Sequence, residues 1–160
     1  MTDLEFWSED KRFGLAISQP NLTRLLQFCN QAGNRETGGI LVGLYNHSHN
    51  CAIVTAISKL PPDSKRGTNW FERGIHGLQQ WLDSLWLQEQ QYYLGEWHFH
   101  PQADPTASKD DIEQMQLISK SKLYQCPEPL LLIIGGNPPK HWNLRVYVFP
   151  QNASFVELIR

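Results

Sequence analysis

The stretch YLGEWHFHPQADPTASKDD occupies residues 93–111 and carries the most informative pattern of the chain. Its first part reads as a strand, its middle as a Pro-containing loop at 101–107, and its end as a helix that starts from Ser108. Within it, His98, Phe99 and His100 are followed by seven residues, then by Ser108, by two more residues and by Asp111. The pattern is therefore H-x-H-x7-S-x2-D, on a strand, loop and helix in series.

The spacing of this pattern predicts a metal site. On an extended strand, residues two apart point to the same face about 6.5 Å from each other, so both His98 and His100 can converge on one metal ion. Asp111 lies in the first turn of the next helix, where the loop can return its carboxylate to the end of the strand. Three protein ligands leave the fourth position of a tetrahedral zinc ion for water, which is the composition of a catalytic site. The sequence predicts one zinc ion per chain and a hydrolytic reaction.

Each residue of the pattern also has an ordinary structural explanation. Ser108 is a favoured residue for a helix N-cap, Asp111 suits the positive end of a helix, and a His pair can simply be solvated. A second H-x-H, His47 and His49, lies in an Asn-flanked turn with no Ser or Asp at the later offsets, and predicts only a polar hairpin tip. The complete set at 98–111 favours the metal site over these separate explanations.

The neighbouring segments predict a sheet with helices. Apolar residues after Pro20 recur at helical spacing, with Asn21 as a possible N-cap and Gly33 beyond the helix end. A second amphipathic helix is predicted over 73–89, with its apolar side, including Trp81 and Trp86, in the core. Strands are predicted at 38–45, 51–58, 92–100, 130–134, 142–149 and 155–159, and a surface loop at 60–69. The order predicts an α/β fold, a mixed and mostly antiparallel sheet packed between helices.

The composition predicts a globular domain and excludes several classes of partner. The chain has 160 residues, of which 41% are hydrophobic and 19% charged, so one core and one domain over 1–160 are expected. Fourteen basic and 16 acidic side chains form no run that would favour nucleic acid. The longest aliphatic run, Leu130–Ile134, is far shorter than the ~20 residues that cross a membrane.

The cysteines and the first residues favour a cytoplasmic protein. Cys29, Cys51 and Cys126 are odd in number, widely spaced and without a C-x-x-C pair, which is typical of reduced core thiols. The opening residues MTDLEFWSEDKRFG mix acids and aromatics, so they do not resemble an export signal.

With an upstream glutamate added, the pattern resembles the motif of the JAMM (JAB1/MPN/Mov34) metallopeptidases. That glutamate corresponds to Glu36 in ETGGILVG, directly after the first predicted helix. More narrowly, ETGGILVG together with YLGEWHFHPQADPTASKDD resembles the compact bacterial JAB proteins encoded beside activating-like and conjugating-like enzymes, including those of CBASS anti-phage operons. The resemblance implies a single MPN/JAB-like domain over most of the chain.

The resemblance also implies a role for each residue. His98, His100 and Asp111 would hold the zinc, Glu36 would act as general base, and Ser108 would stabilise the oxyanion without acting as a nucleophile. Glu96 is the rival base, because on an ideal strand it shares a face with the two histidines.

The implied activity is that of a zinc-dependent, deubiquitinase-like isopeptidase or peptidase. It would cleave after the C-terminal tail of a ubiquitin-like protein, releasing it from a target amine or from a precursor extension. One alternative is a similar hydrolase that acts on a sulfur-carrier protein in cofactor or cysteine biosynthesis. Another, from a different class, is an MPN scaffold that only mediates protein contacts, against which the intact set of site residues argues.

Overall fold

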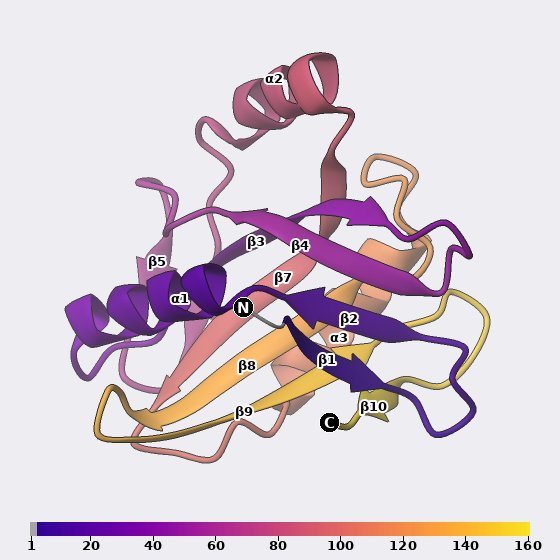
Figure 1. Ribbon diagram of the computed structural model, residues 1–160. Coiled ribbons are helices and arrows are strands. Elements are labelled where there is room, and N and C mark those ends of the chain that lie inside the picture. Colours follow the sequence, from indigo (N-terminus) through magenta and orange to yellow (C-terminus); the bar gives the residue numbers. More distant parts are fainter. Residues whose placement is uncertain (1–2) are drawn as a thin grey trace.

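The computed structural model describes residues 3–160, and it confirms a mixed α/β fold with one large sheet (Figure 1). The helices are α1 (Gln19–Ala32), α2 (Leu78–Glu89) and α3 (Lys109–Lys120). The large sheet contains, in spatial order, β1 (Leu4–Trp7), β2 (Gly14–Ile17), β4 (Cys51–Ile57), β3 (Thr37–Tyr45), β7 (Tyr92–Pro101), β8 (Leu130–Asn137), β9 (His141–Val148) and β10 (Val156–Leu158). A separate hairpin contains β5 (Lys65–Arg66) and β6 (Phe71–Glu72). Within the large sheet only β2–β4 and β7–β8 pair in parallel, so it is mostly antiparallel as predicted.

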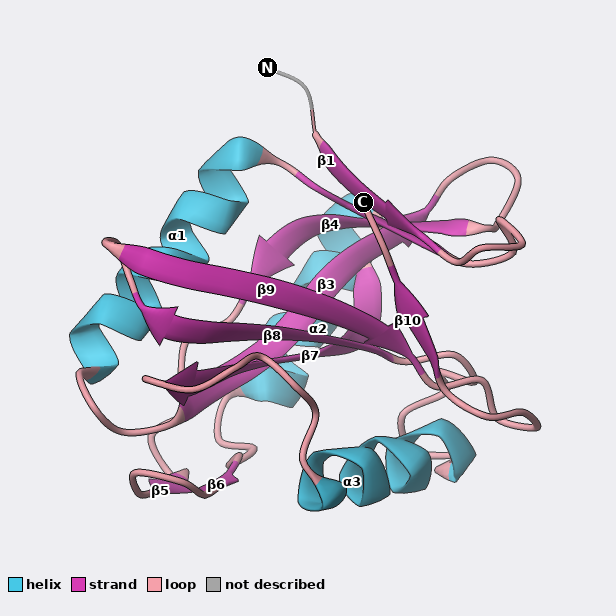
Figure 2. Ribbon diagram, turned by 90° about the horizontal axis from the view of Figure 1, so that it is seen from below, coloured by secondary structure: helices cyan, strands magenta, loops and turns pink. Residues whose placement is uncertain are grey.

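The two outer strands of the large sheet meet each other. The backbone N–H of Trp7 donates to the carbonyl of Ile159 at 2.8 Å, and the N–H of Ile159 donates to the carbonyl of Trp7 at 2.9 Å. Because β1 and the segment after β10 are thus hydrogen-bonded, the sheet curls until its first and last strands are joined (Figure 2).

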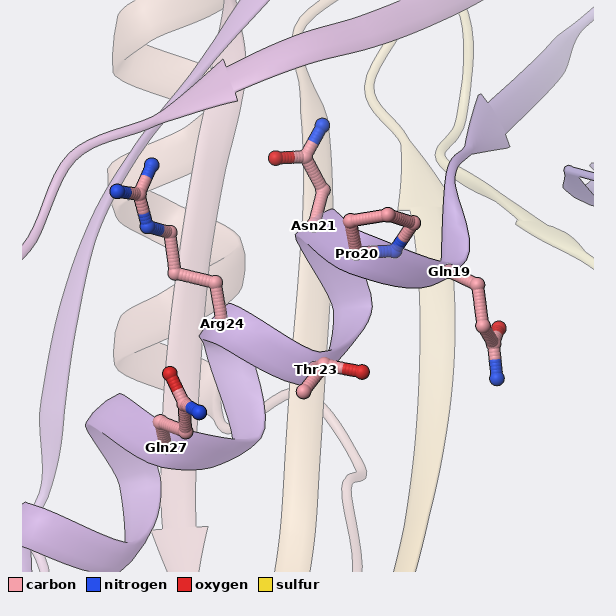
Figure 3. A pocket seen from close by; sticks show the side chains of 6 residues that line it. All are labelled: Gln19, Pro20, Asn21, Thr23, Arg24 and Gln27. Carbon is pink, nitrogen blue, oxygen red and sulfur yellow. The ribbon is translucent and has the colours of Figure 1, made fainter. Parts of the chain in front are cut away.

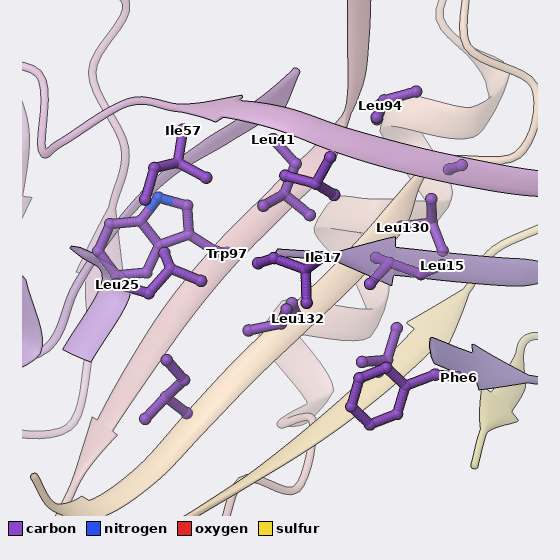
Figure 4. Close-up of a cluster of buried hydrophobic side chains, with 14 of the residues drawn as sticks. Phe6, Leu15, Ile17, Leu25, Leu41, Ile57, Leu94, Trp97, Leu130 and Leu132 are labelled. Carbon is purple, nitrogen blue, oxygen red and sulfur yellow. The ribbon is translucent and has the colours of Figure 1, made fainter. Parts of the chain in front are cut away.

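Helices cover both faces of the sheet, α1 on one face and α3 on the other (Figure 2). The α1 face holds a core cluster that includes Leu130, Leu132 and Ile134 of β8 (Figure 4). The alternate residues Leu131 and Ile133 belong to a second cluster, on the α3 face. The uninterrupted aliphatic run of β8 therefore follows from burial of the strand on both faces.

Helix α1 begins earlier than its predicted cap. The N-cap is Ser18, whose Oγ accepts a hydrogen bond from the backbone N–H of Asn21 at 3.3 Å, so the prediction of Asn21 as N-cap was wrong. Pro20 lies within the first turn, where the missing N–H of proline has no helical partner to lose. The predicted end is confirmed, because Gly33 follows Ala32 as the C-cap.

Helix α2 begins at Leu78, five residues after the predicted start. Residues 73–77 are instead held in an irregular path, in which the Asp63 carboxylate accepts the backbone N–H groups of Ile75 (3.0 Å) and His76 (2.9 Å). No residue of α2 is fully buried, and Trp86 is 50% exposed, so its assignment to the core was wrong. Trp81 is half-buried against the α3-face cluster.

The remaining features follow the prediction in part. The sequence did not predict β1 and β2, and the expected surface loop at 60–69 contains β5. Cys29, Cys51 and Cys126 are buried and unpaired, as predicted. No helix within residues 3–160 combines the length and the apolar character needed to cross a bilayer.

Candidate active site

Strand β7 presents three polar side chains on the α3 face of the sheet. Trp97 and Phe99 point into the α1-face core, so the alternation of a strand places Glu96, His98 and His100 on the opposite face. The side chains of both histidines are only 10% exposed. The two predicted ligands therefore lie side by side in a sheltered position, where β7 ends.

Asp111 of α3 reaches both imidazoles. Its Oδ1 lies 3.0 Å from His98 Nδ1, and its Oδ2 lies 3.2 Å from His100 Nε2. The same carboxylate forms a capping box with Ser108: the Ser108 N–H donates to Asp111 Oδ2 at 2.9 Å, and the Asp111 N–H donates to Ser108 Oγ at 3.1 Å. Asp111 therefore both completes the capping box of α3 and contacts the two histidines.

The loop between β7 and α3 is fixed to the neighbouring strands. The Gln102 N–H donates to the Gly136 carbonyl at 2.8 Å, and the Ala107 N–H donates to the Tyr147 hydroxyl at 3.2 Å. The loop also lies so close to Gly135 that a Cβ there would be 2.3 Å from the Ala103 carbonyl oxygen. This close packing fixes where α3 begins, and with it the position of Asp111.

Glu36 directly precedes β3, the strand beside β7. Strand β3 pairs with β7 so that Thr37 opposes Phe99 and Gly38 opposes His98, and continuing this register brings Glu36 opposite His100. The side chain is half-buried. Burial and the Asp111 carboxylate raise the pKa of Glu36, while the charges of His100 and His98 oppose that change. A carboxyl group with a raised pKa beside two imidazoles is typical of a general base.

Gly38 lets neighbouring groups approach the backbone of β3 closely. A Cβ on Gly38 would lie 2.4 Å from the Trp97 carbonyl oxygen, 2.7 Å from the Phe71 ring and 3.1 Å from His98 Cδ2. Phe71 of β6 contacts His98 edge-on, with ring centroids 5.3 Å apart and an interplanar angle of 79°. Gly38 therefore lets the Phe71 ring, the His98 imidazole and the Trp97 carbonyl oxygen approach the strand.

The charges of the site are strongly coupled. Burial alone would raise the pKa of Asp111, but hydrogen bonds with His100 and His98 hold it well below its usual range. Burial alone would lower the pKa of His100, but the hydrogen bond and the negative charge of Asp111 raise it. The carboxylate is therefore kept ionised, which is the state needed for a metal ligand.

The donor set fits a zinc ion. Two imidazoles and one carboxylate are nitrogen and oxygen donors of the kind that zinc accepts. Here the donors are hydrogen-bonded directly to each other, through both oxygens of Asp111. Among residues 3–160 no group of three or more His, Cys, Asp or Glu side chains is placed so that it could hold a metal ion as it stands, so the fit rests on the chemistry of the donors.

Glu96 shares the face of the histidines but is occupied by other partners. Its Oε1 accepts a hydrogen bond from Arg73 Nε, and its Oε2 accepts one from the Tyr93 hydroxyl at 2.5 Å. Because both oxygens are engaged, the geometry favours Glu36 over Glu96 as the base. Phe71 and Arg73 were not predicted as neighbours of the site, because no local spacing connects them to the motif.

A hollow elsewhere on the surface has no comparable chemistry. It lies along the exposed side of α1 (Figure 3) and is lined by Gln19, Pro20, Asn21, Thr23, Arg24 and Gln27. These side chains include no carboxylate, imidazole or thiol, so the hollow offers neither an acid–base pair nor a set of metal ligands.

Comparison with known proteins agrees with the sequence resemblance. Residues 18–146 match the family described as prokaryotic homologs of the JAB domain. A protein of Enterobacter hormaechei named "CD-NTase/cGAS isopeptidase" is 36% identical over 156 residues, covering 98% of this chain and 86% of that protein. An Escherichia coli protein of the same name is 35% identical over 106 residues, or 63% of this chain and 62% of that protein.

A solved structure agrees with the fold. The solution structure of a protein from Desulfitobacterium hafniense has a TM-score of 0.63 and 17% identity, and the match covers 88% of this chain and 87% of that one. Taken with the family match over 18–146 and the relative that covers almost the whole chain, the chain belongs to the family of prokaryotic JAB-domain proteins.

Proposed function

We propose that the chain is a zinc-dependent isopeptidase of the JAMM type that hydrolyses the bond after the C-terminal tail of a modifier protein. The observation that carries this proposal is the convergence of Glu36, His98, His100 and Asp111 at one end of β7, with Ser108 at the start of α3. The relatives named "CD-NTase/cGAS isopeptidase" support the reaction class and suggest a CD-NTase as one partner in the bond. The family resemblance suggests a ubiquitin-like modifier.

Under this proposal, His98, His100 and Asp111 hold one zinc ion. When bound, zinc lowers the pKa of a bound water to ~7 and polarises the substrate carbonyl. Glu36 takes a proton from the attacking water and passes it to the leaving amine. Its half-buried position opposite His100 supports this role, because it places the carboxylate beside the proposed ligands.

Ser108 stabilises the negative charge on the substrate oxygen. Its Oγ already accepts the Asp111 N–H, so its own hydroxyl hydrogen is available to donate toward the site. Among residues 3–160, the Ser108 hydroxyl has no hydrogen bond with a group that could take its proton. This argues against Ser108 as a nucleophile.

Ser108→Ala should lower kcat by about 10²- to 10³-fold, which corresponds to the ~2.7–4 kcal/mol that one preorganised oxyanion donor contributes. It should also cost about 0.5–2 kcal/mol of stability, because an N-cap is lost. Ser18→Ala is the matched control, since it removes the N-cap of α1 at the end of that helix farther from Glu36. Urea unfolding of both variants measures the loss of stability, and steady-state kinetics measures the loss of kcat. Equal kcat in the two variants would contradict an oxyanion-stabilising role for Ser108.

The proposed hydrolysis implies other enzymes that form the bond. Activating-like and conjugating-like enzymes would form the bond that this enzyme cleaves, in a bacterial anti-phage system, as the family resemblance suggests. We place the reaction in the cytoplasm, supported by the three buried and unpaired cysteines, and we expect neither nucleic acid nor a membrane as partner. We further propose that residues 1–160 act as one domain.

The test uses two folded substrates and one unfolded one. The purified protein is incubated with a CD-NTase conjugated through its C-terminus to a lysine, with a ubiquitin-like domain carrying a C-terminal extension, and with casein. We expect a single cut directly after the tail of at least one folded substrate, located by mass spectrometry. Scattered cuts within the tail, or equal cleavage of casein, would instead indicate a general peptidase. A sulfur-carrier protein with a C-terminal extension is added as a further folded substrate, and cleavage restricted to it would favour the biosynthetic alternative.

A further inference from the structure

Residues 58–77, here called the connector, link β4 to α2 and contain the β5–β6 hairpin. At its start, Ser58 is hydrogen-bonded to Ile40 of β3 and to Trp97 of β7. The rest of the connector is tied mainly to itself: Asp63 accepts two backbone N–H groups of residues 75 and 76, and Ser64 Oγ accepts the N–H of Gly74 at 2.8 Å. The hairpin lies on the same side of β7 as α3 (Figure 2). It is not part of the large sheet, so its position over β7 depends on a small number of side chains and on one backbone hydrogen bond, from the Glu36 N–H to the Gly67 carbonyl.

Two of those side chains contact β7 in register. Phe71 packs edge-on against His98, and Arg73, two residues later, donates to Glu96, two residues earlier on β7. The segment 71–73 therefore runs antiparallel to 96–98 across the face that bears the histidines. Gly38 of the adjacent strand makes room for the Phe71 ring.

The Arg73–Glu96 pair is buried and fully hydrogen-bonded. The two side chains are 9% and 3% exposed. Arg73 Nη2 donates to the Tyr124 hydroxyl at 2.8 Å, Arg73 Nη1 donates to the Gly74 carbonyl at 2.8 Å, and the Tyr93 hydroxyl donates to Glu96. Burial alone would lower the pKa of Arg73, but the Glu96 carboxylate outweighs it and raises the pKa.

Such a pair needs an explanation other than stability. Desolvation of two charges offsets most of their attraction, and a buried pair can often be replaced by apolar residues without loss of stability. Its advantage is directional, since a guanidinium held by a carboxylate, a phenol and a carbonyl has one position only. None of the catalytic roles proposed above uses either residue.

The hairpin in turn borders the proposed base. The Glu36 N–H donates to the Gly67 carbonyl at 2.8 Å, and the Gly67 N–H donates to the Trp70 carbonyl at 3.0 Å. Trp70 itself is 50% exposed. We propose that Arg73 and Glu96 are positioning residues, whose buried ion pair holds the β5–β6 hairpin against β7 and so pre-orders the wall beside Glu36 where the modifier tail binds. The part about the tail rests on the proposed function; the part about the hairpin does not.

Hydrogen exchange tests the position of the hairpin without a substrate. The double variant Arg73→Met with Glu96→Leu removes both charges, so no unpaired charge stays buried and the protein can fold. Arg73→Lys keeps the charge but cannot reach Glu96 and Tyr124 together. Arg12→Met is the matched control, because Arg12 is exposed in the turn before β2.

In the double variant, peptides within 60–77 should exchange about tenfold faster than in the unchanged protein, with all other peptides unaffected, and Arg73→Lys should lie between the two. The control should match the unchanged protein throughout. Unchanged exchange in 60–77, or faster exchange over the whole chain, would overturn the proposal, because the pair would then be either dispensable or a general stabiliser.

Kinetics on the CD-NTase or ubiquitin-like substrate test the consequence for binding. We expect KM to rise about tenfold in the double variant, kcat to stay within about twofold, and zinc content to be unchanged, because the tail then has to order the wall that it binds. A fall in kcat at constant KM would contradict the proposal that Arg73 and Glu96 order the wall that binds the tail. If the unchanged protein cleaves neither substrate, the proposed function fails, while the exchange result still decides whether the pair holds the hairpin.

Discussion

Glu36→Gln should reduce turnover by about 10²- to 10⁴-fold while zinc stays bound, because the amide keeps the shape of the side chain but cannot accept the proton of water. The register between β3 and β7, continued by one residue, places Glu36 opposite His100, where its carboxylate lies beside the proposed ligands. Single-turnover kinetics measures the loss of turnover, and elemental analysis of the same preparation measures the zinc content.

The control for this variant is Glu113→Gln, an exposed glutamate of α3 paired only with Lys109. It should retain the activity of the unchanged protein. If Glu36→Gln stayed near full activity and Glu96→Gln lost it, the base would be Glu96. That result would require the Glu96 carboxylate to leave its bonds with Arg73 and Tyr93 during catalysis.

His98→Ala should lose zinc and turnover together. Removal of a direct ligand should weaken zinc binding by more than about 100-fold, since even partners outside the ligand set contribute about 10–100-fold. The unchanged protein should contain one zinc per chain, and added zinc should not restore the variant at micromolar concentration. Elemental analysis and a competition titration with a chelator measure both quantities.

The chain supplies a matched control in its second H-x-H. His49 lies in the exposed turn between β3 and β4, with no carboxylate among its hydrogen-bond partners, so His49→Ala should leave zinc content and activity unchanged. An unchanged protein that holds no metal, and gains no activity when zinc is added, would contradict the metal site itself.

The elements that could be predicted are those whose signal is local. Strand β7 alternates between core and site, so the spacing of His98 and His100 already placed both on one face. The aliphatic residues of β8 and the N-cap of α3 are equally local signals, because each depends on residues within a few positions of one another. The set of residues proposed for catalysis could be named from sequence because four of its five members lie within 98–111.

What could not be predicted depends on distant contacts. Phe71 and Arg73 have no spacing relation to β7, and only the folded connector places them over His98 and Glu96. The start of α2 was set too early because Ile75 continues the helical spacing of Leu78 and Leu82, although Asp63 holds the backbone of residues 75 and 76 in another path. Strands β1 and β2 are four residues each, too short for a periodic signal to separate them from turns.

The joining of Trp7 to Ile159 has a consequence for how the protein forms in the cell. These residues are about 150 positions apart, so at the usual rate of about 5–20 residues per second the ribosome adds Ile159 roughly 8–30 s after Trp7. During that interval β1 has β2 as a neighbour but lacks the partner on its other side. An unpaired strand edge is a template for association with other chains, so nascent protein is most exposed to misassembly before synthesis passes residue 159. Residues 98–111, which we propose as the main part of the active site, are translated well before this closure.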